Sequence, residues 1–361
     1  MAIKSKRILL ITSEFPPLPG GIGNHAFLLS KYLIKLEYNV SVLTDYRSLK
    51  EDNFFDANQN FKIVRVKRNI FTYLNRFLKS ISLIKDSDII IASGKFSLWL
   101  SAILSQIFKN KKYVAVLHGS EIKAGNKILQ KFTKWSLTQF HDLIAVSNFT
   151  KEFALSVNPN LKITVINNGI EIESLTEEKS IPKSLQLITV GNVTYRKGQQ
   201  NVIKALPLLK EFYTDIHYHC IGIPTKKEDF LELAEQLNVQ NLITFHGKLN
   251  NTEKHNLLKN ASIFIMLSDK INNDFEGFGI AILEANAMGL PAIGSYNSGI
   301  ADAIKNNFSG ILVDPHKEDE ILLAIQKIIK SYKNYSSNAK VWSLQFNWTN
   351  IIKQYVKRIE I

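Results

Sequence analysis

The chain has 361 residues, of which 45% are hydrophobic and 21% charged, a composition typical of soluble globular proteins with room for two domains. No apolar run approaches the ~18 residues that a membrane-spanning helix requires. A single cysteine, Cys220, excludes an internal disulfide and favours a reducing cytoplasm. No Cys/His cluster has the spacing of a structural zinc site. We therefore expect a cytoplasmic protein.

The net charge of +13 belongs to one half of the chain. Residues 1–170 hold 24 Lys and Arg against 11 Asp and Glu, whereas residues 171–361 hold 21 of each sign. The basic first half predicts an anionic partner. Because none of the RNA- or DNA-binding signatures is present, we expect an anionic membrane surface and no nucleic acid.

Strands alternate with helices through the first half. The apolar run Arg7–Thr12 predicts a strand, which the glycine-rich loop 20–23 joins to a helix from about Asn24 to Leu36. This order is Rossmann-like, although the loop lacks the G-x-G-x-x-G spacing and no ribose-binding acid follows it. On the residues alone, a simple tight turn explains the loop equally well. Further strands are predicted at 40–44, 61–66, 88–92, 113–117 and 143–147.

Residues 67–85 combine an apolar stripe at helical spacing with basic side chains. The stripe consists of Ile70, Phe71, Leu74, Phe77, Leu78, Ile81 and Ile84. The basic residues expected at its ends and on its other face are Arg65, Lys67, Arg68, Arg76, Lys79 and Lys85. Such a helix can lie in a membrane interface, or it can pack its stripe on the sheet with its lysines in water. Both interpretations remain open, and the second describes the commoner arrangement.

The strand at 113–117 ends at His118-Gly119-Ser120-Glu121. Ligands of parallel sheets lie beyond the carboxyl ends of the strands, which makes His118 a candidate site residue. A lone histidine is otherwise more often structural.

The second half begins after a polar segment, 171–183, which we expect to be a linker. A strand at 185–190 leads into the loop 191–198, which carries Arg196 and Lys197. Cations in a strand-to-helix loop can neutralise a diphosphate, arginine in bidentate fashion and lysine as a point charge. Further strands are predicted at 218–222, 243–245, 262–267, 291–294 and 310–315.

The most informative stretch is 274–291, where Glu276 and Glu284 flank a Gly-Phe-Gly turn and the start of a helix at Ile280. The first turn of a helix offers free N–H groups and a positive dipole end, which suit phosphate. Carboxylates accept hydrogen bonds from sugar and ribose hydroxyls. The combination predicts a nucleotide-sugar site, whereas the simplest alternative is a pair of solvated acids at a helix start.

This stretch resembles the E-x7-E signature of the retaining glycosyltransferases of family 4, which have the GT-B fold. The resemblance implies that Glu276 lies at the donor sugar and that Glu284 binds the ribose hydroxyls. It covers nearly the whole chain, and within the stretch it includes Phe275, Gly277, Phe278, Gly279, Ala285, Gly289 and Pro291.

The resemblance also implies roles for residues outside this stretch. Catalytic residues are expected to be Glu276, His118, Lys197 and Arg196. Donor-binding residues are expected to be Gly20, Gly21, Arg196, Lys197, Gly247, Lys248, Phe278, Gly279, Ile280 and Glu284. Asn192 stands where the family usually has an arginine, which puts tight diphosphate binding in doubt. The Asn168-Gly169 turn resembles the one that closes the first domain.

The expected fold is α/β of the GT-B type, with two doubly wound Rossmann-like domains facing across a cleft. Residues 1–170 would form an acceptor-binding domain, and residues 184–348 would bind the nucleotide sugar. By resemblance, a last helix at about 349–361 crosses back to the first domain.

The expected activity is retaining transfer of a sugar from a UDP- or GDP-linked donor to an acceptor hydroxyl. No cofactor is expected, and no metal, because no Asp-x-Asp pair has a metal-like context; Arg196, Lys197 and helix N-termini would carry the phosphate charge. The basic first half indicates a lipid-linked glycan acceptor at the inner face of the cytoplasmic membrane, as in O-antigen or capsule synthesis. The alternatives are a soluble small-molecule acceptor and a non-catalytic sugar-nucleotide-binding module. A nicotinamide dehydrogenase fits less well, since the dinucleotide fingerprint is missing.

Overall fold

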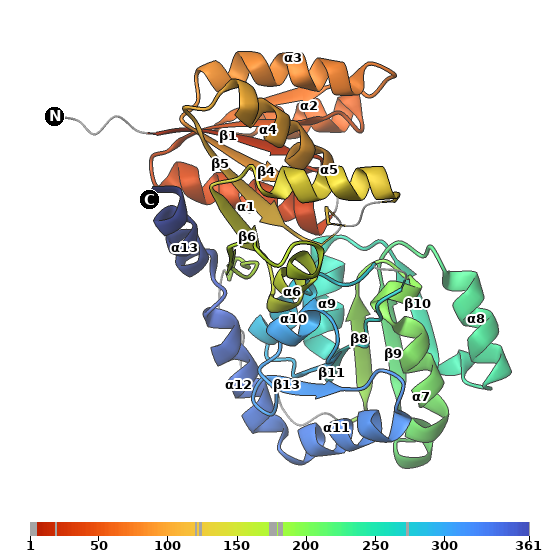
Figure 1. The fold of residues 1–361 in the computed structure, drawn as a ribbon. Helices are drawn as coiled ribbons and strands as arrows, with labels where there is room; N and C mark the ends of the chain where they lie inside the picture. Colours follow the sequence, from red (N-terminus) through yellow and green to blue (C-terminus); the bar gives the residue numbers. More distant parts are fainter. Residues whose placement is uncertain are drawn as a thin grey trace. The chain divides into compact units, whose positions relative to one another are not determined.

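Strands and helices alternate along the chain, and the strands form two separate parallel sheets (Figure 1). The computed structural model describes residues 6–18, 20–119, 121–122, 125–172, 179, 183–271 and 274–360. The chain divides into unit 1, Met1–Gly169 with Trp348–Ile361, and unit 2, Ile170–Asn347. The sequence places these limits at residues 170 and 348, and most of the expected linker lies outside the described residues.

Unit 1 is built on a seven-stranded parallel sheet with the order β3-β2-β1-β4-β5-β6-β7. The central strands are nearly continuous apolar runs because helices cover both faces of the sheet. Every residue of β4 is buried, for example. The strands are β1 (Arg7–Thr12), β2 (Asn39–Asp45), β3 (Lys62–Val66), β4 (Ile89–Ser93), β5 (Lys112–Leu117), β6 (Asp142–Ala145) and β7 (Ile163–Val165).

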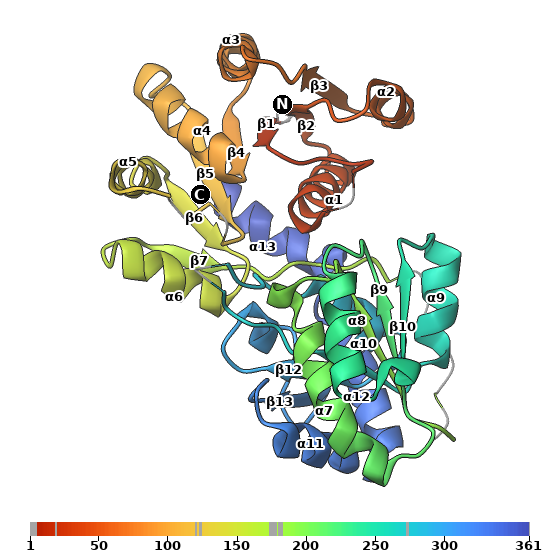
Figure 2. The same ribbon diagram turned by 90° about the vertical axis from the view of Figure 1, so that its right-hand side faces the viewer.

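The helices of unit 1 are divided between the two faces of this sheet. They are α1 (Gly21–Lys35), α2 (Leu49–Ala57), α3 (Thr72–Lys85), α4 (Lys95–Ile107), α5 (Lys127–Leu137), α6 (Asn148–Val157) and α13 (Trp348–Glu360). Right-handed crossovers place α3 to α6 on one face and α1 and α2 on the other, as Figure 2 shows. The last helix, α13, packs on α1. Its Tyr355 hydroxyl lies 2.9 Å from His25 Nε2, and its Trp348 ring stacks on Tyr32.

The apolar stripe predicted at 67–85 is divided between the core and the surface. Ile84 is buried, and Phe77 and Ile81 pack against the same core cluster. By contrast, Ile70, Phe71, Leu74 and Leu78 are exposed. Neither of the two arrangements expected from the sequence describes the whole stripe, because one side of α3 packs on the sheet while the other faces outward.

Two of the arginines expected at the ends and on the other face of this helix have buried side chains. Arg76 pairs with Asp45 at 3.4 Å. Arg65, on β3, lies 3.3 Å from Asp52 and 2.8 Å from Asp56. The sequence did not predict this burial, which is possible because carboxylates compensate both charges inside the unit.

Unit 2 has a six-stranded parallel sheet with the order β10-β9-β8-β11-β12-β13. Its strands are β8 (Gln186–Val190), β9 (His217–Ile221), β10 (Ile243–Gly247), β11 (Ile263–Met266), β12 (Ala292–Ser295) and β13 (Gly310–Val313). Its α-helices are α7 (Gln199–Phe212), α8 (Lys227–Gln236), α9 (Asn251–Asn260), α10 (Ile280–Ala287), α11 (Glu318–Lys330) and α12 (Tyr332–Leu344). Of the helices described in either unit, none is long and apolar enough to span a membrane.

One face of β9 and β10 carries a group of three histidines. His219 Nδ1 lies 3.0 Å from His246 Nε2, and the ring centres of His217 and His219 are 4.8 Å apart. His219 Nε2 lies 2.9 Å from Gln186 Oε1. Burial, together with the neighbouring imidazoles, lowers the pKa of His219 to about 4. Burial also lowers the pKa of His217 and of His246.

These histidines predict a loss of stability in mild acid. An unfolded histidine binds its proton near pH 6.5, whereas folded His219 does so only near pH 4, so the unfolded state gains protons first as the pH falls between these values. The melting temperature should therefore drop between about pH 7 and about pH 5. In His219→Gln the drop should be smaller by about 2–4 °C, measured by circular dichroism.

The matched control is His255→Gln, on the exposed side of α9. It should leave the pH dependence of melting unchanged. If both variants gave the same pH dependence as the wild type, His219 would not be one of the acid-sensitive groups.

Candidate functional site

The two candidate cations and the first candidate carboxylate follow neighbouring strands of unit 2. The strand order reverses between β8 and β11, and ligands of open parallel sheets bind beyond the carboxyl ends at such a reversal. Arg196 and Lys197 lie in the short 3₁₀ helix η1 (Tyr195–Lys197) after β8, and Glu276 lies in the loop after β11. Strand order therefore brings Arg196 and Glu276, 80 residues apart, to one edge of the sheet.

Gly198 lets the η1 turn approach the segment that follows β11. Its φ is +78°, and a Cβ at this position would lie 1.8 Å from the carbonyl oxygen of Leu267. Ser268 Oγ and the Asp269 N–H both donate to the carbonyl oxygen of Arg196, at 2.7 and 3.0 Å. A side chain at position 198 would push the turn away, so the position of both cations depends on this glycine.

Glu276 is the shared partner of the two cations. Lys197 Nζ lies 2.9 Å from Glu276 Oε2, and Arg196 Nη1 contacts the same oxygen. Arg196 Nε lies 3.7 Å from the more exposed Asp274. Burial alone would raise the pKa of Glu276, but the charges of Lys197 and Arg196 outweigh it and hold this pKa below its ordinary value. A diphosphate would compete with Glu276 for both cations.

The main chain next to Glu276 is held by a residue to which the sequence assigned no role. Gly299 opens the 3₁₀ helix η3 (Gly299–Asp302), and its N–H donates to the carbonyl oxygen of Glu276 at 2.9 Å. A Cβ at Gly299 would lie 2.0 Å from the carbonyl oxygen of Gly277. The sequence offered one indication of this role: Gly299 closely follows strand β12 and therefore lies at the same edge of the sheet.

Helix α10 begins at this edge and runs back along the sheet. Gly279, with φ +84°, precedes it, and Ile280 is its first residue. Its first N–H groups therefore open near the end of the sheet that carries the cations, where they suit an anion. Phe278 is 2% exposed, and its ring centre lies 5.9 Å from that of Phe346. Burial leaves only the main chain of Phe278 available to a ligand.

Glu284 lies one turn into α10 and has a different partner from Glu276. Lys254 Nζ, on α9, lies 3.2 Å from Glu284 Oε2, and 36% of the Glu284 side chain is exposed. The two glutamates therefore take separate positions, one among the cations after β8 and one facing α9.

The remaining candidates of unit 2 lie at the ends of β8 and β10. Gly247 ends β10 with φ +69°, its carbonyl accepts from the Gly222 N–H at 2.9 Å, and Lys248 after it is exposed. Asn192 is exposed two residues after β8, and its carbonyl accepts from Gln199 at 3.2 Å. These residues lie at the same carboxyl edge of the sheet as Arg196, Lys197 and Glu276. In the described part of the chain, no hydrogen bond or ion pair joins the two groups.

In unit 1, His118 follows β5 and lies beside the end of β4. Its Nε2 is 3.0 Å from Ser93 Oγ, and its ring centre is 5.1 Å from that of His25 on α1. Burial lowers the pKa of His118 to about 3, so the imidazole is neutral at physiological pH. His118 can therefore exchange hydrogen bonds with a hydroxyl but carries no charge.

Gly20 and Gly21 lie at the start of α1, which follows β1 at the same edge of unit 1. A Cβ at Gly20 would lie 2.7 Å from Glu14 Oε2, whereas a Cβ at Gly21 would meet no atom within 4 Å. Because that oxygen ends a flexible side chain, close packing requires neither glycine.

Glu121 is a buried acid to which the sequence assigned no role. Its Oε2 accepts from the N–H groups of His118 and Gly119, at 3.0 and 2.8 Å. Burial raises the pKa of Glu121 to about 7, against the lowering effect of these hydrogen bonds. Glu121 therefore fixes the turn that presents His118, and the signal was an acid three residues after the histidine.

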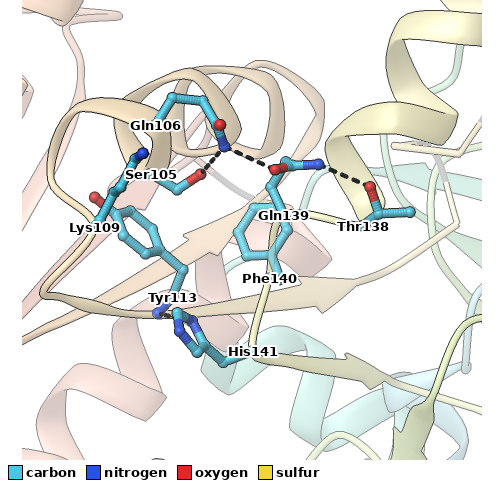
Figure 3. A pocket seen from close by; sticks show the side chains of 8 residues that line it. All are labelled: Ser105, Gln106, Lys109, Tyr113, Thr138, Gln139, Phe140 and His141. Atoms are coloured by element: carbon cyan, nitrogen blue, oxygen red, sulfur yellow. Dashed lines mark hydrogen bonds between the residues drawn. The ribbon is translucent and has the colours of Figure 1, made fainter.

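A separate pocket of about 340 Å³ lies elsewhere in unit 1 (Figure 3). Among its lining residues, Gln106 bonds to Ser105 and Gln139, and the Tyr113 N–H donates to His141. Tyr113 is the second residue of β5, so the pocket lies at the amino ends of the strands, opposite the edge with His118. Its position and its internally bonded lining separate it from the candidate site.

Two family models match consecutive parts of the chain. Residues 19–174 match Glycosyltransferase Family 4, and residues 171–342 match Glycosyl transferases group 1.

Several known proteins are similar over most of the chain. The uncharacterized glycosyltransferase MJ1607 of Methanocaldococcus jannaschii is 26% identical over 98% of both chains. The GDP-mannose-dependent alpha-(1-6)-phosphatidylinositol monomannoside mannosyltransferase of Mycobacterium tuberculosis is 21% identical over 90% of this chain and 89% of its own. The amylovoran biosynthesis glycosyltransferase AmsK of Erwinia amylovora is 28% identical over 59% of this chain and 54% of its own.

The fold also has solved counterparts. The crystal structure of Anabaena Alr3699/HepE in complex with UDP and glucose superimposes with a TM-score of 0.79 at 18% identity, over 98% of this chain and 99% of that one. At this identity the likeness establishes the fold, two Rossmann-like units of the GT-B type. Together, the two family models show that the chain belongs to the family 4 type of glycosyltransferases and is a transferase enzyme.

Proposed function

We propose that the protein is a retaining glycosyltransferase that moves a sugar from a nucleotide diphosphate to an acceptor hydroxyl. The observation that carries this proposal is the cluster of Arg196, Lys197 and Glu276 at the strand-order reversal of unit 2. HepE was crystallised with UDP and glucose, and the mycobacterial relative is named for GDP-mannose. Both names support a nucleotide-sugar donor and leave its base open between uracil and guanine.

In this mechanism the donor diphosphate replaces Glu276 as the partner of Arg196 and Lys197. Negative charge grows on the leaving phosphate as the bond to the sugar breaks, so fixed cations stabilise the transition state more than the ground state. The first turn of α10, from Ile280, adds N–H donors. With these groups in place the reaction needs no metal or other cofactor.

The carboxylates then bind hydroxyls. Glu276, released from the cations, accepts hydrogen bonds from the donor sugar, and Glu284 accepts from the ribose. His118 is neutral and contacts a hydroxyl of the donor sugar or of the acceptor. Gly247 and Lys248 contact the nucleotide base, and Gly20 and Gly21 approach the diphosphate and the acceptor.

Retention follows from attack on the face that the phosphate leaves. The bond between the anomeric carbon and the phosphate oxygen breaks, and the bond to the acceptor oxygen forms on the same face. The acceptor's proton passes to the departing phosphate. Glu276 positions the sugar and forms no bond to it.

The proposed acceptor is a lipid-linked glycan, bound by unit 1 at the inner face of the cytoplasmic membrane. The basic first half of the chain supports an anionic environment. Two relatives are named for amylovoran biosynthesis and for a phosphatidylinositol mannoside, which supports a role in building a polysaccharide on a lipid. A soluble acceptor is the alternative if transfer proves independent of membranes.

The donor site is tested by titrating UDP- and GDP-sugars by calorimetry. One nucleotide class should bind the wild type. Glu284→Ala should bind roughly tenfold or more weakly, because hydrogen bonds to a charged group contribute about 1.5–3 kcal/mol. Glu235→Ala, on the exposed side of α8, is the control and should bind normally. If the wild type bound neither class, the donor assignment would fail.

Removal of one cation should weaken diphosphate binding selectively. Lys197→Ala should lower the affinity for the free nucleoside diphosphate roughly tenfold to hundredfold, since a charge-assisted contact is lost. Lys204→Ala, an exposed lysine of the following helix α7, is the control. Equal affinities of the two variants would contradict the role of Lys197.

The retaining mechanism is tested with donor and acceptor together. NMR of the product should show the anomeric configuration of the donor, and mass spectrometry should detect no glycosyl group on Glu276. Inversion would rule out retention, and a covalent adduct on Glu276 would rule out same-face attack.

A further inference from the structure

A row of aromatic rings crosses three helices on one face of unit 1. The row runs Tyr73, Phe96, Trp99, Phe132 and Trp135, from α3 through α4 to α5. Successive ring centres are 4.8, 5.6, 5.6 and 5.3 Å apart. Tyr73, Phe96 and Trp135 are 59%, 39% and 37% exposed. We call this set the aromatic row.

Exposed aliphatic side chains extend the aromatic row along the same helices. Leu74 and Leu78 lie on α3, Ile103 and Ile107 on α4, and Ile128 on α5. Helix α4 is apolar on both sides, because Leu98 and its inner neighbours are buried while its outer residues face away from the sheet. A helix that is apolar all round normally has a second apolar environment to meet. Contiguous exposed apolar surface of this kind marks an interaction site.

The charges on these three helices have one sign. Helices α3, α4 and α5 contain no Asp or Glu. Lys79 on α3 and Lys127, Lys131 and Lys134 on α5 are exposed beside the apolar residues. Lys95 lies over Trp99, with Nζ 5.0 Å from the ring centre. The partner that complements this surface is apolar inside and anionic at its boundary.

Part of this surface lies near the carboxyl edge of the sheet. In a parallel sheet the helices run against the strands, so the first turns of α3, α4 and α5 lie near the carboxyl edge. Tyr73, Phe96 and Ile128 belong to these first turns. His118 lies at the same edge of unit 1, after β5. Helices α1 and α2 cover the opposite face (Figure 2).

We propose that the outer faces of α3, α4 and α5 dock unit 1 on an anionic lipid bilayer. The rings of the aromatic row lie at the depth of the headgroups, where tryptophan and tyrosine are favoured. The aliphatic side chains enter the acyl boundary, and the lysines meet anionic headgroups. The edge with His118 then lies beside the bilayer, where a lipid-linked hydroxyl is presented. The docking itself does not depend on the proposed donor chemistry.

A bilayer fits the surface better than a nucleic acid does. Nucleic acids bind through phosphate contacts and through bases stacked on ring faces. They leave exposed aliphatic side chains without a partner, and five such residues surround the aromatic row. A bilayer takes up both the aliphatic side chains and the lysines.

The test is co-sedimentation of the full chain with vesicles of phosphatidylcholine alone or with about 30% phosphatidylglycerol. The wild type should bind the anionic vesicles, and binding should fall with added salt. Leu74→Ser/Ile128→Ser and Lys127→Ser/Lys131→Ser should each weaken binding roughly tenfold or more. The controls are Phe54→Ser and Lys50→Ser, exposed residues of α2 on the opposite face, and both should bind as the wild type does.

Tryptophan fluorescence gives a second measurement. Vesicles should shift the emission of the wild type to shorter wavelength as the partly exposed Trp135 enters the interface, and Trp135→Phe should reduce the shift. The proposal is overturned if the wild type stays in solution with anionic vesicles, if it binds RNA instead, or if the α2 controls weaken binding equally. All variants should keep the donor affinity of the wild type in calorimetry, so failure of docking and failure of the donor site remain distinguishable.

Discussion

The ion-pair cluster of Arg196, Lys197 and Glu276 depends on the fact that β8 and β11 are neighbours in the sheet of unit 2. Their loops meet at one edge only because β9 and β10 extend the sheet in the other direction. Gly198 then allows the first loop to press on the carbonyl of Leu267, which sets the position of Arg196 and Lys197 beside Glu276. The two cations hold the pKa of the Glu276 carboxyl below its ordinary value in spite of its burial. Removing one partner would leave a charge poorly compensated, as in other buried ion pairs.

Unit 1 uses its charged residues in two different ways. Arg65 and Arg76 are buried and paired with Asp45, Asp52 and Asp56, so they contribute to packing and leave little charge outside. The unbalanced lysines lie on the outer faces of the helices, next to apolar side chains. At the carboxyl edge, burial shifts the pKa values of two further ionisable groups. It keeps His118 neutral and raises the pKa of Glu121 to about 7, so this edge can bind hydroxyls without carrying a large charge.

Elements with a strong apolar pattern were located most accurately from the sequence. Buried parallel strands such as β1 and β4 are continuous apolar runs and were located to within a residue or two. Helix α2, Leu49–Ala57, was not predicted, because its sequence has little apolar periodicity. Helix α5 was missed as well, although the Asn126 side chain caps it by accepting from the Leu129 N–H. Glu276, Arg196 and Lys197 became candidates because a resemblance joined distant motifs, whereas Gly299 and Glu121 carried no comparable signal.

By itself the sequence determined the α/β alternation and the uneven charge, because both follow from local pattern and composition, and its resemblance to family 4 supplied the candidate residues of a nucleotide-sugar site. Only the tertiary structure decided which charges face one another and which apolar side chains remain outside. The stripe of α3 shows the reason. Ile84 and Leu78 are equally apolar in the sequence, yet one is buried against the sheet and the other is 56% exposed. Periodicity identifies a helix face, but the side that meets the core depends on strands that are distant in the chain.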